Sequence, residues 1–335
     1  MNSILIVGAG ISGLLAAQEL QAHGFNVTVI DKGRGLGGRM ATRRLIVGER
    51  TGRADHGAQY ITAYHPRFEA FVRDLCANGI LEPWLLTPHQ QHTAKRLRYI
   101  APEGMTAVAK YSARGLQIRL GERVVRLATT EHGWRITTDK NDELQADGLL
   151  ITSPIPQTLM LLDTLDKPIL LPDERMALES VKYIPSIALM LALGDGYSSS
   201  LAEKKMHFEG GKALMWIADN KAKGISPDVP TLTIHTNPDF AAEYWETREE
   251  DLLAIMLQEL GGIVPKDLIQ DYSIHRWRYS RVAKPFPALF FAPKSTSSNL
   301  ILAGDAFAPD TPMMTRVEDA AISGWSAAEY IRELY

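Results

Sequence analysis

Cysteine is almost absent from this chain, which has one among 335 residues. A single cysteine excludes an internal disulfide and a metal site built from several thiolates. That residue, Cys76, lies on the apolar side of an expected helix. We therefore interpret it as an ordinary core thiol.

Long hydrophobic runs and an excess of one charge are also absent. No stretch approaches the roughly 20 apolar residues that a membrane-spanning helix needs, and the N-terminus lacks the basic region of a signal peptide. The net charge of −3 gives no electrostatic basis for binding nucleic acid or an anionic membrane. The nine histidines lack the spacing of metal ligands. These absences predict a cytoplasmic protein with no metal, nucleic-acid, membrane or protein partner.

The N-terminus, in contrast, has a complete dinucleotide-binding pattern. An apolar strand runs into a turn where Gly8 permits the tight bend, Gly10 lets the backbone approach phosphates, and Gly13 lets helix and strand pack closely. The helix that follows directs unpaired N–H groups and partial positive charge toward an anion. A second strand, 26–30, ends at Asp31, whose carboxylate can accept hydrogen bonds from a ribose. The pattern predicts a βαβ dinucleotide-binding unit.

The length suits two intimately joined domains. An apolar strand at 148–152 is expected in the same parallel sheet as the two opening strands. The apolar strand 300–302, followed by Gly304-Asp305, returns to the pattern of the N-terminus. The middle of the chain has several strand-like runs around one expected long amphipathic helix, 238–260. We predict the α/β class, with a Rossmann-type domain and an inserted, mainly antiparallel α+β substrate domain. The expected domains are 1–62, 103–158 and 285–335 for the first, and 63–102 and 159–284 for the second.

A second glycine-rich segment, 32–40, follows Asp31 at once. With Gly38 and Arg39, the chain resembles the flavin-dependent amine oxidase superfamily, in which this glycine pair and arginine lie along the pyrophosphate and ribityl chain of FAD. The C-terminal pair Gly304-Asp305 resembles the superfamily's other FAD motif, where the aspartate binds a ribityl hydroxyl. The resemblance implies bound FAD and an amine oxidase or p-hydroxybenzoate hydroxylase-like fold. Because no cysteine stands near the C-terminal motif, the FAD is expected to be noncovalent.

The same resemblance implies further contacts with FAD. Val125 stands where such proteins hold the adenine through backbone groups, and the C-terminal helix would direct its N-terminus at the flavin. Residues 313–315 lack the glycines common in relatives, so the approach of this turn to the flavin stays open. Arg316 is either a stabiliser of reduced flavin or a solvated arginine. The expected cofactor contacts are Gly8, Gly10, Ile11, Ser12, Gly13, Asp31, Lys32, Gly38, Arg39, Met40, Asp55, His56, Val125, Gly304, Asp305, Met313 and Val317.

The segment 55–62, together with 38–44 and the strand around Trp277, resembles the renalase family. That family oxidises misreduced 2- and 6-dihydro isomers of NAD(P)H. The resemblance implies a small-molecule dinucleotide substrate that passes a hydride to FAD, with O2 reduced to H2O2. Such a donor becomes aromatic when the hydride leaves, so the protein mainly has to stack and orient it.

Tyr60, His235 and Trp277 are the candidate catalytic residues, and each has ordinary core packing as its alternative. Arg96, in a basic cluster with Lys95 and Arg98, is the candidate for binding substrate phosphates; a solvated charge run is the alternative. The neighbouring Asp55 and His56 could form an acid–base pair, but we assign them to the FAD-facing segment. The expected substrate contacts are Gly57, Ala58, Gln59, Tyr60, Ile61 and Arg96.

Other functions stay open. A flavin amine oxidase would act on a small amine, and many of these enzymes use a lysine near the flavin; Lys182, Lys212 and Lys284 are possible here. A non-catalytic FAD-binding protein and a lipid desaturase or isomerase are further alternatives.

Overall fold

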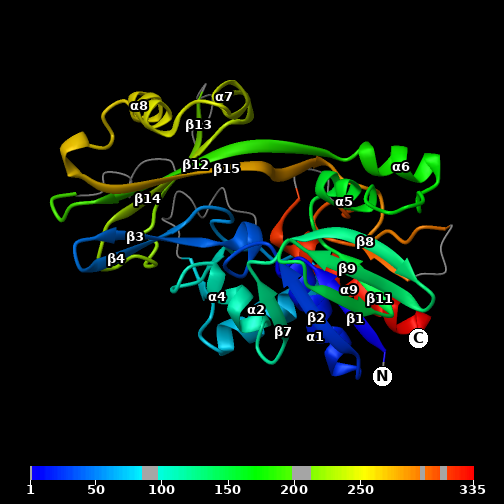
Figure 1. The fold of residues 1–335 in the computed structure, drawn as a ribbon. Helices are drawn as coiled ribbons and strands as arrows, with labels where there is room; N and C mark the ends of the chain where they lie inside the picture. The colour runs from blue at the N-terminus through cyan, green and yellow to red at the C-terminus, as the bar shows by residue number, and fades with distance from the viewer. Residues whose placement is uncertain (1, 85–96, 198–212, 295–298, 310–314) are drawn as a thin grey trace.

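Two β-sheets dominate the fold, and each is covered by helices (Figure 1). The structure is a computed structural model that describes residues 2–84, 97–197, 213–294, 299–309 and 315–335. A parallel sheet with strands from within 3–31, 117–151 and 300–302 forms one half, and an antiparallel sheet with strands from within 182–284 forms the other.

The first sheet is parallel and confirms the predicted α/β class. Its order is β16 (Leu300–Leu302), β11 (Gly148–Ile151), β1 (Ser3–Val7), β2 (Asn26–Asp31) and β7 (Gln117–Leu120). The strands are almost continuously apolar because both faces of the sheet are covered. The predicted βαβ unit and the expected sheet neighbours of β1 are therefore present.

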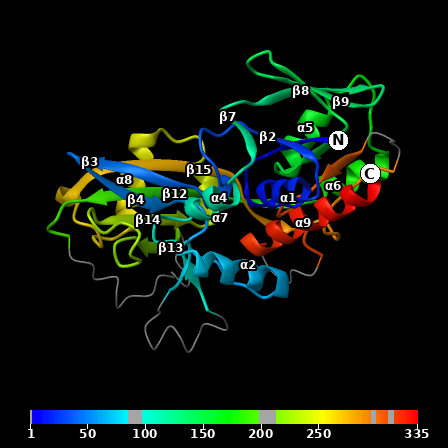
Figure 2. The ribbon, with the colours of Figure 1, turned by 90° about the horizontal axis from the view of Figure 1, so that it is seen from below.

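One face of this sheet packs against α1 (Ile11–Ala22) and α9 (Val317–Leu334), which lie side by side (Figure 2). Their close approach depends on Gly324, where a Cβ would lie 2.3 Å from the carbonyl oxygen of Ser12. The other face packs against α5 (Ile155–Leu162) and a small antiparallel sheet around the fully buried Trp134. That small sheet consists of β8 (Val124–Thr130), β9 (Gly133–Thr138) and β10 (Glu143–Ala146).

The second large sheet is antiparallel, with the order β13–β14–β12–β15. Its outer face packs on two helices, α7 (Pro238–Glu243) and α8 (Glu249–Glu259), in an apolar core. The strands are β12 (Lys182–Leu193), β13 (Leu214–Asp219), β14 (Thr231–Thr236) and β15 (Ile269–Lys284).

A hairpin of β3 (Thr42–Val47) and β4 (Arg50–Asp55) packs against the inner face of the second sheet. The contact is tight at Gly52, where a Cβ would lie 2.5 Å from Cγ2 of Thr231. The sequence assigned this hairpin to the Rossmann-type domain, yet its packing ties it to the other half. The domain boundaries therefore stay a prediction.

The single helix expected over 238–260 is wrong, because α7 and α8 are separate. Between them the carbonyl of Thr247 accepts a hydrogen bond from Arg276 at 2.5 Å, and Trp245 packs under the guanidinium of Arg278 at 4.8 Å. Contacts with β15 thus replace the backbone bonds that a continuous helix would make.

Shorter elements complete the described chain: α2 (Pro66–Ala77), β5 (Glu82–Pro83), β6 (Tyr99–Ile100), α4 (Thr106–Ser112), α6 (Pro172–Glu179) and the 3₁₀ turns η1 (Gly38–Met40) and η2 (Lys266–Leu268). Within the described ranges, no helix combines the length and apolar character needed to cross a bilayer.

Candidate functional site

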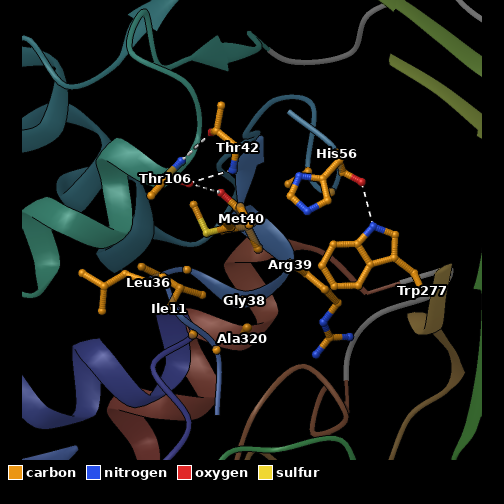
Figure 3. Close-up of a pocket in the computed structure, with 18 of the residues that line it drawn as sticks. Ile11, Leu36, Gly38, Arg39, Met40, Thr42, His56, Thr106, Trp277 and Ala320 are labelled. Carbon is orange, nitrogen blue, oxygen red and sulfur yellow. Dashed lines mark hydrogen bonds between the residues drawn. The ribbon is translucent and has the colours of Figure 1, made fainter. Parts of the chain in front are cut away.

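A large cavity of about 2780 Å³ begins at the Gly8–Gly10 turn and reaches the inner face of the antiparallel sheet. Figure 3 shows the η1 turn in this cavity, between Ile11 on one side and His56 and Trp277 on the other. Pockets for one small ligand typically enclose about 300–1,000 Å³. This cavity therefore has room for a dinucleotide and a second molecule.

The glycine turn is shaped for a pyrophosphate. At Gly8, φ is +117° and a Cβ would lie 2.4 Å from Oγ1 of Thr152, while a Cβ on Gly13 would lie 2.0 Å from the Gly8 carbonyl oxygen. A Cβ on Gly10 would instead meet nothing within 4 Å, although Gly10 lines the cavity. The N-terminus of α1 has no side-chain cap. Free amides beside an open space fit the phosphates of a dinucleotide.

Ser12 and Asp31 complete this end of the cavity. The Ser12 hydroxyl is buried and has no hydrogen-bond partner in the described part of the chain. The Asp31 carboxylate accepts hydrogen bonds from the amides of Ala9, at 2.7 Å, and Gly33, at 2.6 Å. These amides hold Asp31 at the end of β2, where the sequence predicts contact with a ribose.

Arg39 and Asp305, from the two glycine-rich motifs, meet across 266 residues of sequence. Two hydrogen bonds join them, from Nη1 to Oδ2 at 2.5 Å and from Nη2 to Oδ1 at 2.6 Å, and Arg39 also donates to the carbonyl of Tyr279. Burial acts to lower the pKa of Arg39, but the charge and hydrogen bonds of Asp305 outweigh it and raise that pKa. The pair joins the segments around Arg39 and Asp305. Direct contact of either residue with FAD stays a prediction.

At the far end of the cavity, His56 joins two of the candidate catalytic residues. Its carbonyl accepts hydrogen bonds from Nε1 of Trp277 at 2.7 Å (Figure 3) and from Nε2 of His235 at 3.1 Å. The His56 and Trp277 rings stack with centroids 5.3 Å apart, and His275 packs edge-on against Trp277 at 4.1 Å. The structure therefore brings together residues that are about 180 and 220 positions apart in sequence.

The three histidines of this cluster are neutral at physiological pH. Burial, together with nearby charged groups, lowers the pKa of His56 to about 3 and those of His235 and His275 to about 4. The cluster cannot act as a cationic acid near pH 7. It instead offers flat, uncharged rings that suit stacking against another planar ring.

These histidines predict a pH dependence of stability. Between pH 6.5 and about 4 the unfolded chain binds protons that the folded protein excludes, so stability falls as the pH falls. We expect each buried histidine to contribute about 1 kcal/mol per pH unit to that slope. Urea unfolding at pH 7, 6 and 5 measures it, and His235→Gln should give a shallower slope by about that amount. Equal slopes for the variant and wild type would contradict the neutral assignment.

Tyr60 stands in an aromatic wall beside this cluster. Its ring centroid lies 5.9 Å from that of Trp216 and 6.0 Å from that of Trp84, and the guanidinium carbon of Arg98 lies 4.5 Å from the Tyr60 centroid. Tyr60, Trp216 and Arg98 all line the cavity. The segment 57–61, called the substrate strip below, also lines the cavity. Its contact with a substrate stays a prediction.

The cavity is strongly basic, although the whole chain has a net charge of −3. Among the described residues that line it, fifteen are lysine or arginine and six are aspartate or glutamate. Such a lining attracts anions and disfavours cations.

Asp55 differs from its prediction as a cofactor contact, since it is fully buried and does not line the cavity. Its carboxylate accepts hydrogen bonds from the Thr42 hydroxyl at 2.7 Å and the Met105 amide at 2.9 Å, and lies 3.5 Å from Nζ of Lys223. Lys223 is a buried lysine that also donates to Gln59 at 3.3 Å. No sequence signal marks Lys223, because its polar segment is typical of an exposed turn.

The other predicted residues are placed as follows. Gly13 packs against the Gly8 carbonyl, outside the cavity lining, and Cys76 is half-buried in α2, also outside it. Arg96, Met313, Lys95 and Lys212 lie outside the described residues. No cluster of metal-ligating side chains occurs in the part of the chain that the structure describes. The cavity is lined by Ile11, Lys32, Gly38, Met40, Gly57, Ala58, Gln59, Ile61, Val125, Gly304, Arg316 and Val317.

Comparison with known proteins agrees with this geometry. Residues 6–75 match the model of the NAD(P)-binding Rossmann-like domain, and 84–332 match that of flavin containing amine oxidoreductases. Renalase of Mus musculus is 31% identical over 297 residues, which cover 84% of this chain and 86% of that protein.

Solved structures show the same fold at low identity. A putative protoporphyrinogen oxidase from Exiguobacterium superposes with a TM-score of 0.68 at 14% identity, and a mutant of putrescine oxidase with 0.68 at 15%. Each comparison covers 99% of both chains. The fold of these two proteins therefore extends over 99% of this chain.

Proposed function

Since this chain belongs to the flavin-containing amine oxidoreductase family, as a renalase-like flavoprotein with FAD as its cofactor, we propose that it oxidises dihydro isomers of NAD(P)H. The substrate would be a 2- or 6-dihydro isomer, which loses a hydride and leaves as NAD(P)+. Bound FAD would accept that hydride and pass the two electrons to O2, which takes up two protons and becomes H2O2.

The basic lining of the cavity carries this proposal. The phosphates of FAD neutralise only part of the excess of fifteen basic over six acidic residues. A second anionic molecule is favoured by the remaining charge, whereas a protonated amine is disfavoured. A dihydropyridine dinucleotide combines that negative charge with a planar reacting ring.

The far end of the cavity suits the reacting ring. A dihydropyridine gains aromaticity as the hydride leaves, so no strong base is needed. Neutral His56, His235 and His275 with Trp277 can hold such a ring and restrict its orientation, which is the main contribution that this chemistry asks of a protein. Tyr60 and Trp216 limit the ring on the neighbouring side.

Anaerobic mixing with candidate donors tests the proposal. We expect 2- or 6-dihydro-NAD(P) to bleach the flavin absorbance within seconds and to yield one NAD(P)+ per flavin. Monoamines and polyamines should leave the protein yellow. Bleaching by an amine and by none of the isomers would contradict the proposal.

The alternatives have less support. Lys32 and Lys110 are the lysines among the described lining residues, and both lie with the nucleotide-binding elements; Lys182 and Lys284 lie outside the lining. The lysine that many amine oxidases place by the flavin thus has no counterpart in the described lining around Tyr60 and Trp277. A non-catalytic role leaves the large space beyond the dinucleotide site unexplained. The cytoplasmic location and the absence of a protein partner stay predictions.

A further inference from the structure

Arg98 is held rigidly next to the substrate strip. Its carbonyl accepts a hydrogen bond from the Trp84 amide at 2.8 Å. The next residue, Tyr99, exchanges two backbone hydrogen bonds with Ile61, each of 2.8 Å. These bonds fix the backbone of Arg98 beside Tyr60 before any ligand binds.

The guanidinium of Arg98 lies against the Tyr60 ring, and Arg98 lines the cavity. Its carbon lies 4.5 Å over the Tyr60 ring, and in the described part of the chain no carboxylate pairs with it. A guanidinium that rests its face on an aromatic ring keeps its in-plane N–H donors for other partners. Those donors match two oxygens of a phosphate.

Several other arginines of the cavity lining already have hydrogen-bond or ion-pair partners. Arg39 pairs with Asp305, Arg50 with Asp195, Arg53 with Glu103, and Arg276 with the Thr247 carbonyl. Arg281 lies near Tyr60 as well. Burial lowers the pKa of Arg281, and an approaching anion would stabilise its positive charge. Arg98 and Arg281 near Tyr60 therefore favour the binding of a negatively charged group there.

We propose that Arg98 binds the phosphate attached to the ribose of the dihydropyridine, and so selects phosphorylated nicotinamide donors over the free nucleoside. This inference rests on the proposed function. It assigns to Arg98 the anchoring role that the sequence suggests for the neighbouring Arg96. The ribose would span from the ring at Trp277 and Tyr60 to the phosphate at Arg98.

The assignment is tested by comparing wild-type protein and Arg98→Gln with donors that do or do not contain the phosphate. We compare 6-dihydro isomers of nicotinamide mononucleotide and of nicotinamide riboside, which differ by one phosphate, as anaerobic reductants. Arg98→Gln should raise KM for the mononucleotide about 10- to 100-fold and leave that for the riboside unchanged. The rate at saturation should change little for either donor, and Arg98→Lys should restore part of the loss.

Arg67→Gln serves as the matched control, because the guanidinium carbon of Arg67 also lies 4.5 Å from an aromatic ring, that of Trp325, but Arg67 does not line the cavity. This variant should retain wild-type preference for the phosphorylated donor. Affinity for oxidised mononucleotide and riboside, read from the change in flavin absorbance on binding, gives a second readout that needs no turnover.

The outcomes separate the two proposals. If neither isomer reduces the wild-type flavin, the proposed function fails. If both reduce it and Arg98→Gln raises KM equally for the two donors, Arg98 acts only by packing on Tyr60 and this inference is overturned. If wild-type protein already binds both oxidised ligands equally, the inference fails as well.

Discussion

Replacing Gly10 with valine should give a folded protein that is colourless when purified. The backbone at Gly10 has φ −77°, which any residue can adopt, and a Cβ there would touch no protein atom within 4 Å. The added side chain would instead fill the space beside the N-terminus of α1, where we predict that the phosphates of FAD bind. We expect about 100-fold weaker FAD binding.

Flavin absorbance per polypeptide and titration of the apoprotein with FAD measure this effect, and circular dichroism checks the fold. Gly13→Ala provides the contrast, because its Cβ would lie 2.0 Å from the Gly8 carbonyl oxygen and would destabilise the βαβ unit itself. A yellow Gly10→Val protein with wild-type affinity would show that FAD does not approach this turn.

The second large effect is expected for Lys223→Met, which should lower the free energy of unfolding by about 3–5 kcal/mol. The Lys223 and Asp55 side chains are 1% and 0% exposed, so methionine would leave a buried carboxylate without its cation. Burial acts to lower the pKa of Lys223 and outweighs the opposing charge and hydrogen bond of Asp55. Burying this ion pair therefore costs desolvation free energy, and removing only its cation costs more.

Urea unfolding of the FAD-loaded protein measures the loss. Lys221→Met is the matched control, since Lys221 is exposed two residues away and its loss should change stability little. Adding Asp55→Asn to Lys223→Met should recover part of the stability, because it removes the unpaired charge. A Lys223→Met protein as stable as the control would contradict a structural ion pair.

Lys223 also supports the substrate strip. It donates to Gln59, whose amide donates in turn to the Asp55 carbonyl at 2.5 Å and the Gly57 carbonyl at 3.2 Å. Loss of Lys223 should therefore shift the flavin absorbance spectrum as well as stability. Lys223 thus holds the substrate strip through Gln59. The hydrogen bonds of Trp277 and His235 to the carbonyl of His56 hold the residue that precedes the strip.

The features that the sequence predicts well are local. The strand, glycine turn and helix at 3–22 follow from neighbouring residues, because Gly8 and Gly13 have no room for a side chain and the apolar pattern gives the strand. The FAD motifs at the two chain ends are short and dense, so their resemblance to known flavoproteins also identifies the cofactor.

The features that it misses depend on contacts between distant residues. The break between α7 and α8 involves a hydrogen bond that Arg276 on β15 donates to the Thr247 carbonyl. The sequence of residues 238–260 alone does not show this contact. The sequence around Lys223 is typical of an exposed turn, but in the structure its side chain is buried against Asp55 and Gln59. The excess of positive charge in the cavity likewise cannot be predicted from the net charge of the chain, which is −3.

A crystal structure of the FAD-loaded protein with NAD(P)+ tests most directly whether one cavity holds both a flavin and an anionic pyridine dinucleotide. We expect the flavin ring along residues 57–61, the pyridinium ring stacked on it next to Trp277 and His235, and a phosphate at Arg98. A pyridinium ring outside this cavity, or a flavin ring away from residues 57–61, would contradict this arrangement.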